Sequence, residues 1–102
     1  MNTAEVVMVR VYLTEGNGQL ETLVKRLHDW EKLKGLTVFR GTAGYGASGV
    51  MHSGSLVDLS LDLPVVVEFF DEPAKVETVL EHLSTFIPSG HMVRWPAQII
   101  VD

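Results

Sequence analysis

The sequence predicts a single α+β domain of 102 residues whose elements follow one another in the order βαββαβ. Two observations support this prediction. Segments rich in valine, which favours strands, alternate with segments whose apolar residues recur at helical spacing. No repeat, linker or low-complexity segment divides the chain, and its 46% hydrophobic content is typical of a globular core. We therefore expect one domain over residues 1–102.

The first strand and the first helix are separated by a change in hydrophobic period. Residues 5–13 (EVVMVRVYL) alternate with the two-residue period of a strand, and Gly16 and Gly18 end that segment. The next apolar residues recur at helical spacing as far as a stop at Gly35, and they are Leu20, Leu23, Val24, Leu27, Trp30 and Leu33. Trp30 is therefore expected in the core between helix and sheet.

The remaining elements follow the same alternation of strand and helix. Asp71 can cap the second helix, and Pro73 suits its first turn. Pro96 would mark a sheet edge or a bulge in the last strand. The predicted elements are strands over residues 36–43 and 64–70, a helix over 72–87 and a strand over 91–101.

Both crossover connections contain a helix, which favours a split βαβ topology. We expect a ferredoxin-like sandwich, a four-stranded antiparallel sheet with two helices on one face. Side-chain parity predicts a core face of Val7, Val9, Val11, Thr37, Phe39, Val65, Val67, Phe69, Val93 and Trp95. The opposite face would carry Val6, Met8, Arg10, Tyr12, Val38, Arg40, Val66, Glu68, Phe70, Met92 and Arg94.

Nothing else in the chain is available to cover this second face. Because a mixed apolar patch of that kind usually marks an interface, we expect a homo-oligomer. Its charged residues allow two interpretations. They could form an ion-pair network between subunits, or the excess of three arginines over one glutamate could recruit an anion such as a phosphate. The four residues are Arg10, Arg40, Glu68 and Arg94.

The connection between the second and third strands is unusually long. It spans residues 44–62, where a hairpin would use about two to five residues, and such long connections are usually functional or disordered. Closely spaced glycines at its start would let backbone N–H groups approach an anion. Their spacing matches neither the dinucleotide fingerprint nor the P-loop.

Two strings in this region resemble a known family. They are residues 35–52 (GLTVFRGTAGYGASGVMH) and 61–68 (LDLPVVVE), and they are similar to the small bacterial proteins grouped as domain of unknown function 190. That family is similar in fold to the PII signalling proteins. The resemblance implies a homotrimer that binds adenine nucleotides in clefts between subunits and contacts a protein target through loop 44–62.

The resemblance also implies site residues. Gly44, Tyr45 and Gly46 look like the Gly-aromatic-Gly at the base of the PII target loop, beside the nucleotide. The chain departs from PII proteins after the third strand, where no Gly/Lys phosphate loop is present. The ligand-binding residues that we predict are Arg40, Gly41, Gly44, Tyr45, Gly46, Ser48 and His52, with Arg10 and Arg94 as candidates for phosphate contacts.

Composition excludes several other functions. The net charge of −5 and the absence of a Lys/Arg run argue against nucleic acid as a partner. With no cysteine there is no thiol chemistry, and the four histidines lack metal-ligand spacing, so we predict neither a metal nor a cofactor. The N-terminus lacks a signal-peptide pattern, and the apolar runs are shorter than the roughly 20 residues of a membrane span. We expect a cytoplasmic protein without membrane insertion.

The function best matched by these observations is a PII-like regulatory protein with no catalytic residue. A second hypothesis is a ligand-free oligomeric module that recognises a protein partner, such as a membrane transporter. A small enzyme with His52 as its base is a third. Fold resemblance alone does not choose among them.

Overall fold

The computed structural model describes residues 1–16, 18–45, 52–53 and 63–102. Its main elements follow the predicted order βαββαβ, with a short ribbon of two strands inserted before the third main strand. Their bounds are β1 Thr3–Thr14, α1 Gln19–Asp29, β2 Leu36–Arg40, β3 Ala43–Gly44, β4 His52–Ser53, β5 Pro64–Asp71, α2 Pro73–Leu83 and β6 Met92–Ile100.

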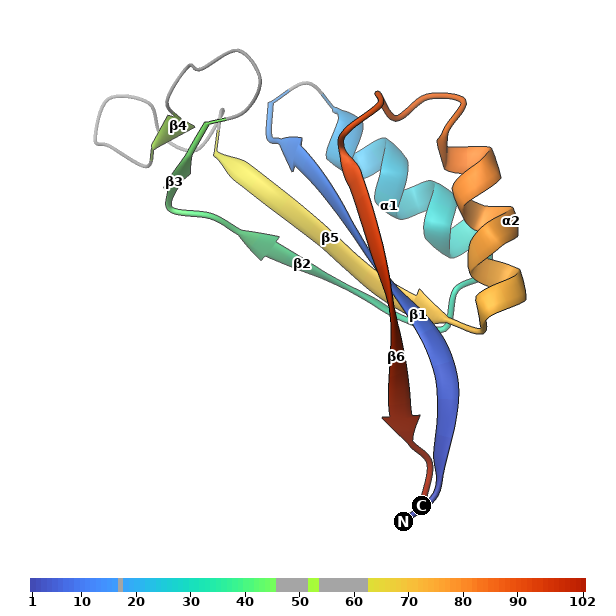
Figure 1. The fold of residues 1–102 in the computed structure, drawn as a ribbon. Coiled ribbons are helices and arrows are strands. Elements are labelled where there is room, and N and C mark those ends of the chain that lie inside the picture. The colour runs from blue at the N-terminus through green and yellow to red at the C-terminus, as the bar shows by residue number, and fades with distance from the viewer. Residues whose placement is uncertain (17, 46–51, 54–62) are drawn as a thin grey trace.

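The four long strands form one antiparallel sheet in the order β2-β5-β1-β6. Both helices lie on the same face of this sheet (Figure 1). The predicted ferredoxin-like sandwich is therefore confirmed. β2 and β6 are its two edge strands, so the Pro96 position at a sheet edge is also confirmed. β6 continues through Pro96, which is the register partner of Val7, and forms no bulge there.

Helix α1 is shorter than its apolar pattern predicts. It begins after Gly18, whose φ of 76° is a left-handed conformation that glycine adopts without a steric penalty. It ends at Asp29, and Trp30 follows as its C-cap residue. The prediction that Trp30 lies in the core is wrong, because the helix stops before that side chain can reach the sheet and leaves it 76% exposed.

Helix α2 begins one residue later than the predicted cap. Asp71 is the last residue of β5, and Glu72 occupies the N-cap position before Pro73. The Asp71 side chain still accepts a hydrogen bond from the Glu72 backbone N–H at 2.8 Å. Asp71 therefore stabilises the connection into α2 without being its cap.

The core lies between the helices and the sheet. β1 and β5 supply most of the sheet's buried side chains, and the predicted inward residues Val65, Val67 and Phe69 are confirmed. The buried cluster consists of Val9, Val11, Leu13, Leu23, Leu27, Leu33, Val65, Val67, Phe69, Val76, Val79, Leu83 and Ile87.

The two edge strands face the opposite way from the prediction. In β2, Leu36 and Val38 pack against the core, while Phe39 is 48% exposed on the other face. In β6, Met92 packs against the core and Trp95 is 38% exposed. Strand pairing explains the difference, because it fixes which residues share a face and a shift of one residue reverses every side chain.

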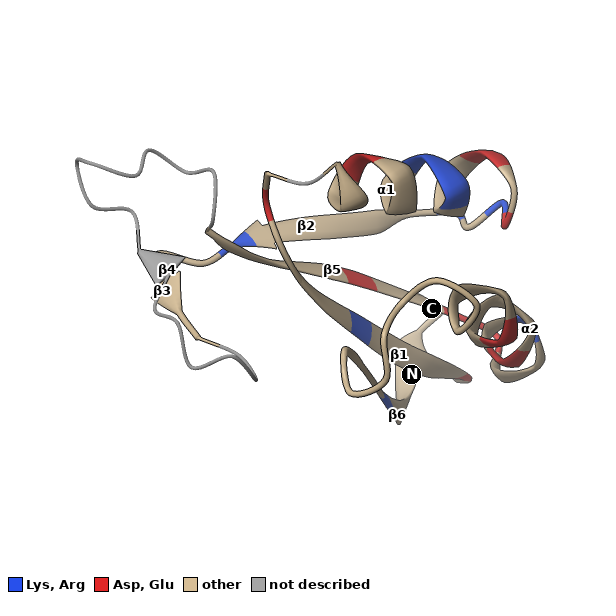
Figure 2. Ribbon diagram, turned by 90° about the horizontal axis from the view of Figure 1, so that it is seen from above, with Lys and Arg blue, Asp and Glu red and all other residues tan. Residues whose placement is uncertain are grey.

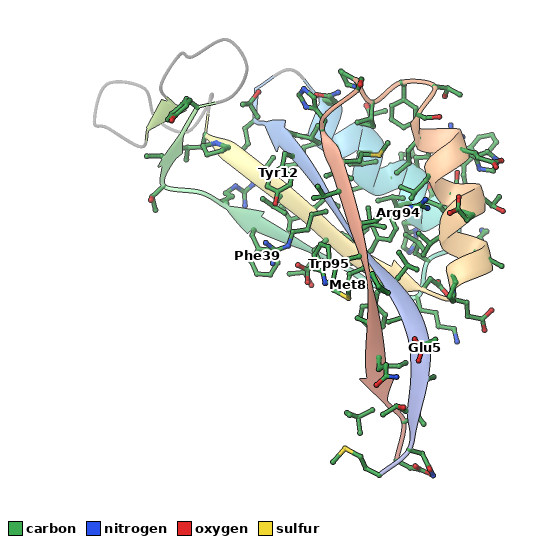
Figure 3. The ribbon with its side chains drawn as sticks, in the orientation of Figure 1. Glu5, Met8, Tyr12, Phe39, Arg94 and Trp95 are labelled. Carbon is green, nitrogen blue, oxygen red and sulfur yellow. The ribbon has the colours of Figure 1, made fainter. Side chains whose placement is uncertain are left out.

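The face of the sheet turned away from the helices is termed the open face. Its centre is a row of residues on β1 and β5 that are paired in register. Figure 3 shows Met8, Tyr12, Phe39 and Trp95 on this side of the ribbon. Register places on it Met8, Arg10, Tyr12, Thr37, Phe39, Val66, Glu68, Phe70, Val93 and Trp95.

Candidate ligand-binding site

Arg40 ends β2 at an edge of the sheet, on the side of the helices. Its Nε donates a hydrogen bond to the Glu15 carboxylate, which follows β1 and is only 14% exposed. The Arg40 side chain itself is 64% exposed. No partner within the described residues engages its two terminal nitrogens, so Glu15 orients a guanidinium fork that remains open to an anion.

Gly41 and Gly44 pack closely against the start of β5. The Gly41 N–H donates to the Pro64 carbonyl oxygen at 2.7 Å. A Cβ at Gly41 would lie 2.8 Å from Pro64 Cγ, and one at Gly44 would lie 3.3 Å from the same atom. Glycine is therefore required at position 41 by packing, whether or not a ligand binds there.

The base of the predicted loop is a two-residue ribbon. Gly44 pairs with His52 and Ala43 with Ser53, so the backbone of His52 returns to the side of Gly44. Tyr45, directly after β3, is 72% exposed. Gly46 and Ser48 lie outside the described residues.

Arg10 lies on the open face. Its Nε donates to Glu68 Oε2 at 2.7 Å, and its guanidinium carbon lies 5.7 Å from the centre of the Trp95 ring. The hydrogen bond to Glu68 raises the pKa of Arg10 above its ordinary value, with a smaller contribution from Tyr12. Arg10 is thus charged and held in place.

Arg94 lies elsewhere, on the helix side of edge strand β6. It is paired with Val9 in register and donates a hydrogen bond to Glu77 on α2. The expected grouping of Arg10, Arg40 and Arg94 on one face is therefore wrong. Each arginine has its own carboxylate in the same chain, which removes the predicted excess of three arginines over one glutamate. Glu15 and Glu77 were not predicted as partners from the sequence, since each is brought to its arginine only by the fold.

A groove borders each of these edge arginines. The larger, of about 730 Å³, lies between α1 and β2 and is lined by Leu20, Val24, Leu33, Leu36, Val38 and Arg40 among others. The smaller, of about 360 Å³, is lined by Val7, Pro73, Ala74, Glu77, Arg94, Trp95 and Pro96. The two grooves lie at opposite edges of the sheet, as the strand order requires.

His91 and His28 have local partners. His91 Nδ1 lies 2.9 Å from the Tyr12 carbonyl oxygen, and His28 Nδ1 lies 2.7 Å from Asp29 Oδ1. The hydrogen bond from His28 lowers the pKa of Asp29. No group of three acidic or histidine side chains within the described residues could hold a metal ion, and neither described helix is long and apolar enough to cross a membrane.

Basic and acidic residues are interspersed over the described elements. Figure 2 shows them mixed along α1 and separated along the sheet, with no continuous basic face among these elements. The candidate site therefore consists of separate arginines, Arg40 and Arg94 on the two edge strands and Arg10 on the central strand β1.

Comparison with known proteins decides the family. Residues 6–99 match the family model DUF190, described as "Uncharacterized ACR, COG1993". The chain belongs to the DUF190 family.

Two relatives are called UPF0166 proteins. One, from Aquifex aeolicus, is 33% identical over 88 residues, or 81% of this chain and 83% of the relative. The other, from Methanocaldococcus jannaschii, is 30% identical over 90 residues, or 84% of this chain and 82% of the relative.

Solved structures show that this DUF190 chain has the PII-like fold. CPII from Thiomonas intermedia K12, a nitrogen regulatory PII-like protein solved with ADP, AMP and bicarbonate, matches with a TM-score of 0.70. The match covers 96% of this chain and 89% of CPII at 22% identity. The apo form of CPII matches with a TM-score of 0.60, 18% identity, and coverage of 96% and 92%. The predicted resemblance in family and fold is confirmed.

Proposed function

We propose that this DUF190 protein is a PII-like regulatory protein that binds an adenine nucleotide in clefts between the subunits of a homotrimer. The observation that supports this most is the fold, shared over 96% of the chain with a PII-like protein solved with ADP and AMP. A nucleotide is a small anion with an aromatic ring, so its recognition needs a few fixed cations and a stacking surface.

The positions of the edge arginines favour a site between subunits. Arg40 and Arg94 lie on the two opposite edge strands, so one chain cannot bring both to the same ligand. In a head-to-tail ring that closes through these edges, the β2 edge of one subunit would adjoin the β6 edge of the next. Such a ring would place both arginines in one cleft, as phosphate contacts from two chains.

The turn after β2 would hold the rest of the nucleotide. Arg40 is oriented by Glu15, and the exposed Tyr45 can stack on the base. Backbone groups near Gly44 and Gly46 would approach the phosphates, with Ser48 and His52 as further contacts. Arg10, held on the open face by Glu68, is a candidate only if the neighbouring subunit brings a phosphate to that face.

Regulation would act through loop 44–62. A nucleotide can shift the loop between two states only if it binds them with unequal affinity. The changed loop would then bind or release a protein target. This mechanism assigns no catalytic residue.

Isothermal titration of the purified protein with ADP, AMP and ATP tests the proposal. We expect saturable binding, weakened at least about tenfold by Arg40→Ala, since a charge-assisted bidentate contact contributes about 1.5–3 kcal/mol. Lys32→Gln is the matched control, because it also removes one exposed positive charge but lies before β2, at the other end from Arg40. Absence of binding at millimolar nucleotide, or equal effects of the two substitutions, would refute the proposed site.

A further inference from the structure

Trp30 is the most exposed aromatic side chain among the described residues, although it directly follows a helix that packs on the sheet. It follows α1 and is 76% exposed. Phe86, just after α2, lines the same surface depression. This depression is termed the Trp30 pocket; it has a volume of about 460 Å³ and is lined by Thr22, Lys25, Arg26, Trp30 and Phe86. Its lining contains two cations and no carboxylate, in a chain whose net charge is −5.

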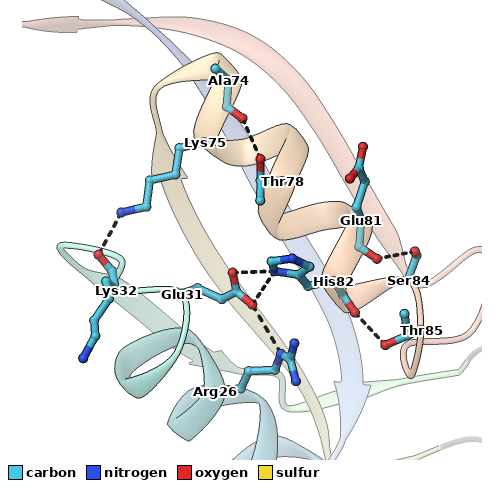
Figure 4. A network of polar contacts seen from close by, with 10 residues as sticks. All are labelled: Arg26, Glu31, Lys32, Ala74, Lys75, Thr78, Glu81, His82, Ser84 and Thr85. Atoms are coloured by element: carbon cyan, nitrogen blue, oxygen red, sulfur yellow. Dashed lines mark hydrogen bonds and ion pairs between the residues drawn. The ribbon is translucent and has the colours of Figure 1, made fainter.

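Arg26 is held in this pocket by a buried carboxylate. Its Nε donates to Glu31 Oε2 at 3.3 Å, and its guanidinium carbon lies 5.3 Å from the centre of the Phe86 ring. The Glu31 side chain is only 6% exposed and also contacts His82 Nδ1 at 2.9 Å (Figure 4). Arg26 is therefore fixed from two sides before anything binds.

The remaining donors of Arg26 are available. Neither terminal nitrogen of its guanidinium has a partner within the described residues, and the side chain is 34% exposed. Lys25, on the same helix, also lines the pocket, and its charge helps to lower the pKa of Asp29, after the hydrogen bond from His28. A planar, prepositioned fork of this kind binds a carboxylate through two parallel hydrogen bonds.

We infer that the Trp30 pocket is a docking site for an acidic segment of a partner protein. A carboxylate of the segment pairs with Arg26, Lys25 attracts a second acidic residue, and an apolar side chain packs between Trp30 and Phe86. Tryptophan and arginine are the residues most enriched at the energetic centres of protein interfaces, where rigid side chains lose little entropy on binding.

The shape and charge of the pocket favour this partner over others. A small-molecule site usually buries about 70–90% of its ligand, which a depression walled by a largely exposed Trp30 cannot do. Nucleic acid and anionic lipid surfaces need clusters of cations, and this pocket has two. A short acidic and apolar peptide segment fits both its charge and its open form.

This pocket adjoins the groove between α1 and β2 that borders Arg40, because Lys25 lines both. Arg26, Trp30 and Phe86 line the Trp30 pocket and not that groove, so they distinguish the two proposed sites. The inference does not depend on nucleotide binding, and either proposal can fail alone.

Titration by NMR tests the inference, with the peptide acetyl-Glu-Asp-Phe-Asp-Glu-amide as the probe. The two tryptophans give separate indole N–H signals. We expect the Trp30 signal to move saturably at millimolar peptide while Trp95, on the open face, serves as an internal control. A peptide with Gln and Asn in place of its acidic residues should leave both signals in place.

Substitutions then assign the contacts. Lys25→Gln and Arg26→Gln should each weaken binding about tenfold, and Lys32→Gln should not change it. Lys25 is included because its substitution leaves the Glu31 network intact. The inference is overturned by an unmoved Trp30 signal, by equal binding of the uncharged peptide, or by a Trp30→Ser protein with a changed oligomeric mass, which would place the pocket in a subunit contact.

Discussion

At the residue scale, the turn after β2 shows how packing and binding can require the same residue. The Gly41 N–H donates a hydrogen bond to the Pro64 carbonyl oxygen. Pro64 also occupies the space that a side chain at position 41 would need. Loss of activity on substituting Gly41 would therefore not identify a ligand contact. Arg40 is the better probe, because its exposed side chain supports no part of the core.

The packing role of Gly41 predicts a measurable loss of stability. A methyl group in Gly41→Ala would lie 2.8 Å from Pro64 Cγ, so the ring or the strand must shift, and we expect a loss of about 1–3 kcal/mol in the free energy of unfolding. Gly35→Ala is the matched control. Nothing lies within 4 Å of its Cβ position, so its stability should change by less than about 1 kcal/mol. Urea unfolding of both variants at equal protein concentration measures the difference, and equal stabilities would contradict this account.

The sequence identified the arginines of the candidate site but could not pair them. Arg40 and Glu15 are 25 residues apart, and Arg94 and Glu77 are 17 apart, on elements whose contact depends on the packed fold. The exposure of Trp30 was missed for a related reason. Its helical spacing was correct, but nothing in the pattern showed that α1 would end at Asp29.

At the element scale, one buried carboxylate connects the two helices. Glu31 accepts from Arg26 of α1 and contacts His82 of α2, and Lys75 of α2 donates to the Lys32 carbonyl oxygen at 2.9 Å (Figure 4). These contacts tie the segment after α1 to both ends of α2. Because a buried charge is costly unless paired, the network should fix the spacing of the helices.

Removing the charge of Glu31 should therefore destabilise the fold. Glu31→Gln keeps the size of the side chain but weakens the contacts to Arg26 and His82, and we expect a loss of about 1–3 kcal/mol. Glu81→Gln, on the exposed side of α2, should change stability by less than about 0.5 kcal/mol. Thermal and urea unfolding measure the stability of both variants. Equal stabilities of Glu31→Gln and Glu81→Gln would mean that the network does not stabilise the fold.

Element order and strand β5 were predictable, whereas the facing of the edge strands was not. Val65, Val67 and Phe69 form an inward row, and the polar Glu68 marks the other face. In β2 one parity carries Leu36 and Val38 and the other carries Thr37 and Phe39, so each offers a large apolar residue. Only the register with β5 decides between them, and a sequence pattern does not contain that register.

At the scale of the whole molecule, the open face carries several large apolar side chains that are partly exposed. Tyr12, Phe39, Phe70, Val93 and Trp95 are each between 38% and 48% exposed on it. They surround the Arg10–Glu68 pair, which is satisfied within the chain and needs no partner. Apolar side chains around a neutralised centre suit burial against a second copy better than contact with a charged ligand.

A charge on this face should therefore break the proposed trimer. In Phe70→Glu the new carboxylate would have to be desolvated in the interface, next to Met8 in register, and we expect the mass measured by light scattering to fall from three chains toward one. Thr78→Glu adds the same charge on the exposed side of α2 and should leave the mass unchanged. If the wild-type protein is itself monomeric, the open face is not a subunit interface. The proposed cleft between β2 and β6 would then lose its basis, because Arg40 and Arg94 can meet only across two chains.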